Sequence, residues 1–134
     1  MVKHVNAKEL EELIKNSSVP VFCDFWASWC GPCRMLAPVL DDVSNKYEGK
    51  AEFVKMDIDE EMNEPAVFKY GISSIPNVIA FKGGKPVDNS LGFKPQAAIE
   101  AFVESNLSEE KIKAARKKFR AVFYFRYFLI NPFL

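Results

Sequence analysis

The sequence is poor in the residues that build disulfide frameworks and metal sites. It has three cysteines, Cys23, Cys30 and Cys33, and a single histidine, His4. Three unevenly spaced cysteines are too few for the multi-bridge framework of a small secreted fold, which favours a reducing compartment. A structural zinc site needs four ligands, and one C-x-x-C with a distant histidine makes zinc the weaker interpretation. We expect no metal and no organic cofactor.

Long apolar leaders and glycine-rich loops are missing too. Residues 1–15 contain no apolar run of the kind found in a secretory signal or a leading membrane anchor, so we predict cytoplasmic residence. The six glycines form no phosphate-binding loop, and the chain has no internal repeat. We expect no nucleic-acid partner.

The size and composition of the chain suit a single domain. With 134 residues and 49% hydrophobic residues, the chain can fill one core.

The formal net charge of zero hides a division of the chain. Residues 1–107 carry 11 Lys+Arg against 16 Asp+Glu, a balance of −5, and residues 108–134 carry 7 against 2, a balance of +5. We therefore predict a domain at 1–107 and a separate C-terminal extension at 108–134.

The extension is basic at first and apolar and aromatic from Phe119 onward. Arg120 and Arg126 interrupt its apolar part, which is too short and too charged for a comfortable membrane span. Four interpretations stay open: no selected role, weak contact with an anionic membrane surface, contact with a partner protein, or packing onto the acidic domain.

Apolar periodicity and turn residues divide residues 1–107 into alternating strands and helices. Asn6 and Glu9 resemble a capping box at the start of the first helix. The predicted elements are a short strand, a helix at 7–16, a strand at 19–27, a helix at 33–47, a strand at 51–57, a short helix from Pro65 to Gly71, a hairpin around Gly83-Gly84, and a helix from Pro95 with Ala98, Phe102 and Val103 on its inner face. This order predicts a mixed α/β sheet with a parallel core and helices on both faces.

The stretch FWASWCGPCRM, residues 25–35, carries the most chemistry. In a helix that opens at Cys30, Cys33 lies one turn away, within reach of disulfide geometry. The positive end of the helix dipole favours the Cys30 thiolate, the species that attacks disulfides, and Cys33 should be the less exposed, resolving sulfur. Gly31 leaves access to Cys30, and Pro32 suits a first helical turn. A purely structural disulfide is the weaker alternative, because so short a loop restricts the unfolded chain little.

Asp24 is the second unusual residue, since it interrupts an apolar strand six positions before Cys30. Burial raises the pKa of an unpaired carboxyl, and a raised carboxyl near a thiol can move protons near neutral pH. The alternative is a satisfied structural aspartate at the end of a strand. Cys23, inside the same strand, is predicted to be an inert core thiol.

WCGPC at 29–33, Asp24, Ile75-Pro76 and Gly92 resemble, in order and approximate spacing, the signature residues of the thioredoxin family. The resemblance covers residues 1–107. It implies the thioredoxin fold, a five-stranded mixed central sheet flanked by four helices, and a cis peptide bond before Pro76.

The resemblance also implies roles for single residues. Cys30 resembles the nucleophile, Cys33 the resolving cysteine, Asp24 the buried proton acceptor, and Lys55 its charged neighbour. A shallow apolar groove that receives the substrate backbone would be lined by Trp29, Gly31, Pro32, Ile75, Pro76, Gly92 and Phe93. Trp26 would pack beneath the active site.

The activity that the resemblance implies is that of a protein thiol-disulfide oxidoreductase, which reduces protein disulfides, carries electrons and maintains cell redox homeostasis. Its only redox group would be the Cys30–Cys33 disulfide. The implied partners are a thioredoxin reductase and disulfide-containing target proteins. Ser74 and Asn77 depart from the usual family pattern, so the preferred targets stay open.

Overall fold

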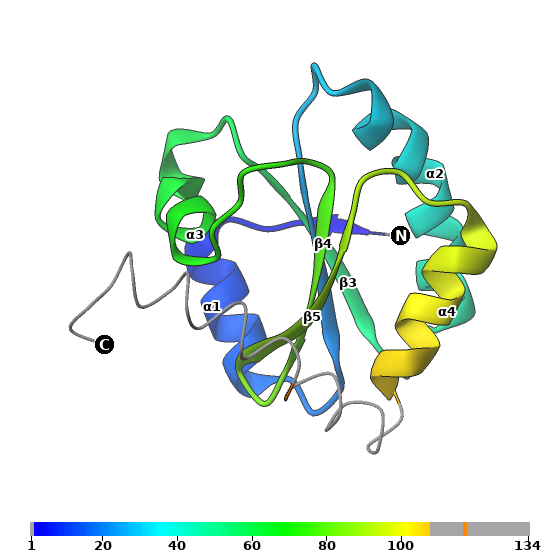
Figure 1. Cartoon of the computed structure of the whole chain (residues 1–134). Helices are drawn as coiled ribbons and strands as arrows, with labels where there is room; N and C mark the ends of the chain where they lie inside the picture. The colour runs from blue at the N-terminus through cyan, green and yellow to red at the C-terminus, as the bar shows by residue number, and fades with distance from the viewer. Residues whose placement is uncertain (1, 108–116, 118–134) are drawn as a thin grey trace.

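Strands and helices alternate along the computed structural model, which describes residues 2–107 and residue 117 (Figure 1). The predicted extension at 108–134 therefore lies outside the described residues except for Lys117, and the division at 107 stays a prediction. The elements are β1 (Lys3–His4), α1 (Ala7–Asn16), β2 (Val21–Trp26), α2 (Gly31–Lys46), β3 (Glu52–Asp57), the 3-10 helix η1 (Glu61–Asn63), α3 (Glu64–Lys69), β4 (Asn77–Lys82), β5 (Lys85–Leu91) and α4 (Gln96–Leu107).

The strands form one mixed sheet in the order β1-β3-β2-β4-β5. β3 runs parallel to both β1 and β2, whereas β4 is antiparallel to β2 and β5. The predicted five-stranded mixed sheet with four helices is thereby confirmed. Because β2 and β3 are parallel neighbours, their carboxyl ends meet at one edge of the sheet, and this edge carries the candidate site.

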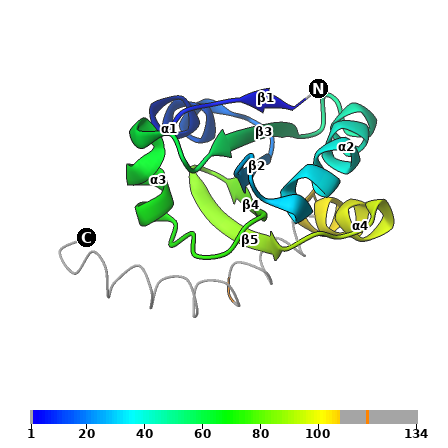
Figure 2. The ribbon, with the colours of Figure 1, turned by 90° about the horizontal axis from the view of Figure 1, so that it is seen from above.

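Helices cover both faces of the sheet (Figure 2). α1 and α3 lie on one face, and α2 and α4 lie on the other. The core under α2 and α4 includes Phe22, Leu36, Leu40, Val43, Ile99 and Val103. The core under α1 and α3 includes Leu10, Ile14, Phe25, Met56, Ile79 and Phe81. Each fully buried side chain of this size contributes roughly 1.5–3 kcal/mol to stability.

Strand β2 lies in the middle of the sheet and is buried on both faces, as its apolar run predicts. Successive side chains alternate between the two cores: Phe22 belongs to the α2 and α4 side, and Cys23 and Phe25 to the other. The same alternation places Asp24 on the Phe22 side, under α2. Cys23 has no exposed surface, which confirms it as a core thiol.

Local signals set the first helix and the hairpin as predicted. The Asn6 side chain accepts from the Glu9 N–H at 2.8 Å, and the Glu9 carboxylate accepts from the Asn6 N–H at 2.9 Å, which completes the capping box. Gly83 and Gly84 both have positive φ, 61° and 78°, the conformation of the tight turn that joins two antiparallel strands.

The inner face of α4 differs from its prediction. Ala98 is exposed, and the buried positions are Ile99, Val103 and Asn106, at i, i+4 and i+7. The prediction for Ala98 is therefore wrong, because the helical stripe is set one residue later, although Val103 is buried and Phe102 half-buried as predicted.

Candidate active site

Cys30 and Cys33 lie where the end of β2 passes into the first turn of α2. Cys30 is the N-cap residue of α2, and its Sγ accepts a hydrogen bond from the Cys33 N–H at 3.2 Å. The two sulfurs form a disulfide, with their Cα atoms 5.2 Å apart. Since the N-cap position faces the unpaired N–H groups of the first helical turn, it stabilises negative charge on the Cys30 sulfur once the bond is reduced.

Both cysteines are nearly buried while they are bonded to each other. Cys30 is 5% exposed and Cys33 2%, so the predicted order of exposure holds but the difference is small. They pack with Ala27, and Trp26 and Ile75 lie against this cluster. Most of the Cys30 surface is therefore covered by neighbours from β2 and from the loop before β4.

The loop before β4 brings a second segment to the sulfurs. The Ile75-Pro76 peptide bond is cis, as the resemblance implies. The Ile75 carbonyl oxygen lies 3.9 Å from Cys30 Sγ, a contact and not a hydrogen bond in this form, because a disulfide sulfur carries no proton. The Gly92 N–H donates to the Pro76 carbonyl at 2.8 Å, which fastens the end of β5 to the same loop.

The predicted groove residues differ in how much surface they present. Trp29 is 65% exposed and Phe93 37%, so aromatic surface is available beside the motif. Pro32 is exposed, Gly31, Ile75 and Gly92 are intermediate, and Pro76 is buried. Pro76 therefore shapes the loop from below the surface, and its neighbours supply the accessible atoms.

The sequence did not predict Asp59, which holds the exposed Trp29 side chain in place. The Trp29 indole N–H donates to the Asp59 carboxylate at 2.7 Å. Asp59 follows β3, and the paired positions Trp26 and Asp57 show that β2 and β3 end side by side. The sequence does show an acidic residue just after β3. Its relevance appears only when the strand order is known, because β3 lies beside β2, the strand that leads into the motif.

Asp24 and Lys55 occupy paired positions on the parallel strands β2 and β3. Asp24 is 3% exposed, and its Oδ1 accepts no hydrogen bond from the described residues. Burial raises the pKa of the Asp24 carboxyl to about 7, against the smaller opposing effect of the Lys55 charge. This rise agrees with the prediction for a buried carboxyl, and the unpartnered Oδ1 favours it over a hydrogen-bonded structural aspartate.

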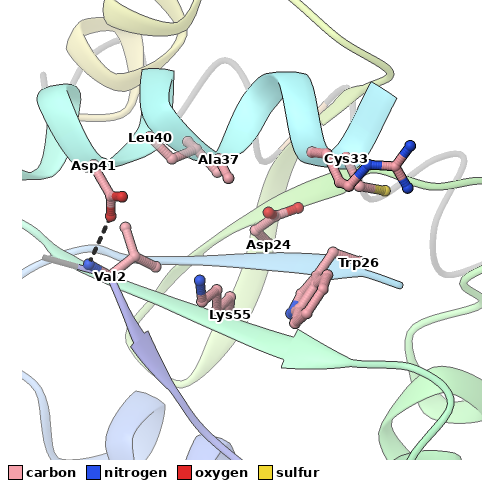
Figure 3. A pocket seen from close by; sticks show the side chains of 9 residues that line it. Val2, Asp24, Trp26, Cys33, Ala37, Leu40, Asp41 and Lys55 are labelled. Atoms are coloured by element: carbon pink, nitrogen blue, oxygen red, sulfur yellow. Dashed lines mark hydrogen bonds between the residues drawn. The ribbon is translucent and has the colours of Figure 1, made fainter. Parts of the chain in front are cut away.

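A cavity of about 70 Å³ between the sheet and α2 connects Asp24 with the motif (Figure 3). Asp24, Lys55, Trp26 and Cys33 all line it, and the Asp24 carboxylate points toward α2. The Lys55 Nζ lies 5.5 Å from the centre of the Trp26 ring. The structure thus brings together the predicted carboxyl, its charged neighbour and the resolving sulfur. This arrangement can pass a proton from a thiol to a carboxylate.

Within residues 2–107 and at residue 117, no group of three or more His, Cys, Asp and Glu side chains is arranged to hold a metal ion. The described helices include none with the length and apolar character needed to span a bilayer.

Three features together define a dithiol-disulfide exchange site. They are a C-x-x-C disulfide at the N-terminus of a helix, a neighbouring loop with a cis proline, and a buried carboxyl behind the disulfide.

Comparison with known proteins agrees with this class of site. The sequence model of the family described as Thioredoxin matches residues 1–105. A thioredoxin of Haemophilus influenzae is 39% identical over 106 residues, which cover 79% of this chain and 97% of that protein. A thioredoxin of Synechocystis sp. is 45% identical over 103 residues, covering 77% and 94%. A chloroplastic M-type thioredoxin of Chlamydomonas reinhardtii is 44% identical over 104 residues, covering 78% and 73%.

The chain belongs to the thioredoxin family. It is a thioredoxin-type thiol-disulfide oxidoreductase, a protein-disulfide reductase whose redox pair is Cys30 and Cys33. Family membership also implies, in general terms, a reductase and target proteins as partners.

Proposed function

We propose that the protein reduces disulfides of target proteins in the cytoplasm, with Cys30 as the attacking sulfur and Cys33 as the resolving one. The observation that carries this assignment is the position of Cys30 at the N-cap of α2, where its Sγ accepts the Cys33 N–H. Cys33 lies one turn further along α2 and lines the same cavity as Asp24.

Two exchanges complete the reaction. The Cys30 thiolate attacks one sulfur of the substrate disulfide, a mixed disulfide forms, and the other substrate sulfur leaves as a thiolate that takes up a proton. The Cys33 thiol then loses its proton to the Asp24 carboxylate, and its sulfur attacks Cys30 Sγ. The second substrate sulfur leaves with both electrons of the broken bond, the substrate is reduced, and the Cys30–Cys33 disulfide remains.

Asp24 suits the role of proton acceptor because its pKa of about 7 lies near the pH of a cytosol. Lys55 limits the rise of that pKa and stabilises the ionised carboxylate. The remaining proposed roles are substrate contacts: Trp29, Phe93, Ile75 and Gly92 present surface beside Cys30, Gly31 and Pro32 leave it accessible, and Pro76 positions the loop.

The oxidised protein must be reduced again, and a thioredoxin reductase is the proposed electron donor. Cytoplasmic residence is supported by the small number of cysteines, which favours a reducing compartment. Maintenance of cellular redox balance follows from the reaction.

The test is insulin reduction under dithiothreitol with two single variants. Cys30→Ser should abolish the catalysed rate. Reduced Cys33→Ser, mixed with insulin after the dithiothreitol has been removed, should accumulate a mixed disulfide that gel analysis detects. If the Cys30→Ser rate equals that of the wild type, the catalytic role of Cys30 is wrong, and a non-catalytic adaptor becomes the alternative when neither protein exceeds the dithiothreitol background.

A further inference from the structure

The cavity over Asp24 has a second end that the exchange reaction does not use. Val2 and Asp41 line this end, and Cys33 lines the other (Figure 3). Cys33 and Asp41 are eight positions apart on α2, so their backbones are separated by about 12 Å along the helix axis. Asp24 and Lys55 lie between the two ends.

Val2 covers this far end because the N-terminal segment crosses from the sheet to α2. Lys3 and His4 pair with Val54 and Lys55 of β3, which fixes the direction of the segment. Val2 then packs into the core under α2 and α4 and is only 5% exposed.

A hydrogen bond from the Val2 backbone N–H to Asp41 Oδ1, 3.2 Å long, adds a direct link between the N-terminal segment and α2. It joins the N-terminal segment to α2 directly across the end of the cavity, as the dashed line in Figure 3 shows. We propose that this Val2–Asp41 clasp closes the cavity against bulk water and thereby sets the proton affinity of Asp24, which makes Asp41 a positioning residue for the resolving step. The proposal rests on the proposed role of Asp24 as proton acceptor.

The electrostatics of the cavity give the clasp its effect. The charged or titratable groups that line the cavity with Asp24 are Lys55 from β3 and Cys33, Arg34 and Asp41 from α2. Asp24 Oδ1 gains no hydrogen bond from the described residues, so exclusion of water, not a nearby donor, governs its ionisation. Water that enters when the clasp opens solvates the carboxylate and lowers the pKa of Asp24 toward its ordinary value. A weaker base then accepts the Cys33 proton more slowly.

The experiment compares Asp41→Ala and Asp41→Asn in the full chain. Asparagine loses the charge but keeps an oxygen that can accept the Val2 N–H, whereas alanine loses both. Asp42→Ala, a change at the exposed neighbouring carboxylate, is the matched control for loss of charge. The pKa of Asp24 is followed by NMR of its side-chain carboxyl carbon in the oxidised protein. Insulin reduction is measured over the same pH range.

We expect the pKa of Asp24 to fall by about one unit or more in Asp41→Ala, and to stay near the wild-type value in Asp41→Asn and Asp42→Ala. Val2→Ala keeps the backbone donor but shortens the side chain that covers the end of the cavity. It should also lower the pKa of Asp24. Equal shifts in Asp41→Ala and Asp41→Asn, or no shift in either, would overturn the clasp. A shift in pKa with an unchanged pH profile of insulin reduction would support the clasp and contradict the proposed role of Asp24.

Discussion

The Trp29 indole N–H and the Asp59 carboxylate form a 2.7 Å hydrogen bond that joins the loop after β2 to the loop after β3. Trp29 is 65% exposed, so little packing restrains its ring, and this bond is what fixes the ring beside Cys30. The apolar surface next to the motif is therefore positioned by a residue outside the motif.

Loss of the Asp59 carboxylate should weaken substrate binding more than turnover. An exposed hydrogen bond of this kind is worth about 1 kcal/mol, so we expect the KM for a protein disulfide to rise about fivefold in Asp59→Ala, with kcat nearly unchanged. Steady-state kinetics with insulin measures this. Glu60→Gln is the matched control, an exposed acidic residue next in the chain, and should leave KM unaffected. An equal change in both variants would mean that charge, not the tether to Trp29, is responsible.

The buried Asp24 carboxyl should make stability depend on pH in a direction opposite to that of an ordinary aspartate. Its pKa is about 7 in the folded protein against 3.8 without the fold. Between these values the folded state keeps a proton that the unfolded chain has lost, so stability falls as the pH rises through this window. Above it, the ionised carboxylate costs about 4 kcal/mol.

Asp24→Asn should remove that cost. We expect the oxidised variant to exceed the wild type by as much as about 4 kcal/mol in free energy of unfolding at pH 9, and to match it near pH 3. Urea unfolding at both pH values gives the comparison, with the exposed Asp42→Asn as control. A gain of the same size at both pH values would show that the effect is packing and not ionisation.

Gly92 should tolerate a side chain poorly although nothing blocks it. A Cβ at this position would meet no atom within 4 Å, but its φ is +78°. We expect Gly92→Ala to lose about 1 kcal/mol of stability, and its N–H bond to the Pro76 carbonyl to weaken with it. Gly31→Ala is the control, since a Cβ there meets only the end of the Arg34 side chain at 4.0 Å and the backbone has ordinary φ. Chemical denaturation should find Gly31→Ala near neutral; a loss equal to that of Gly92→Ala would contradict the conformational explanation.

The basic and aromatic extension, residues 108–134, yields a prediction from composition alone. We expect the full chain to co-sediment with vesicles that contain anionic lipid and less with purely zwitterionic ones. Phe123→Ser combined with Phe125→Ser and Phe128→Ser should reduce the bound fraction. Equal pellets for all combinations would remove the membrane interpretation and leave the other three.

Much of the fold was predictable because the local signals agree with one another. The capping box at Asn6, the apolar run of β2 and the paired glycines of the hairpin each act over a few residues, and each matches the structure. The face of α4 was harder to place, since Ala98 and Ile99 are both apolar and only packing against the sheet decides between them.

The residues of the site also fall into those that local sequence signals predict and those that only the tertiary structure brings together. The C-x-x-C pair and the lone carboxylate of β2 stand out in the sequence, because their chemistry is unusual for those positions. Asp59 and the contact of Val2 with Asp41 do not stand out. The first depends on the order of the strands, and the second depends on which helix the N-terminal segment reaches. Long-range pairs of common residues carry no local signal.

The central claim is that the Cys30 sulfur is stabilised as an anion at the N-terminus of α2. Its most direct test is a titration of thiolate absorbance in reduced Cys33→Ser, where burial raises the pKa of the only other thiol, Cys23, and removes it from the range of interest. We predict that the Cys30 thiolate forms at a clearly lower pH than that of a free cysteine, whose pKa is about 8.5. Ionisation of Cys30 at or above that pH would contradict the account.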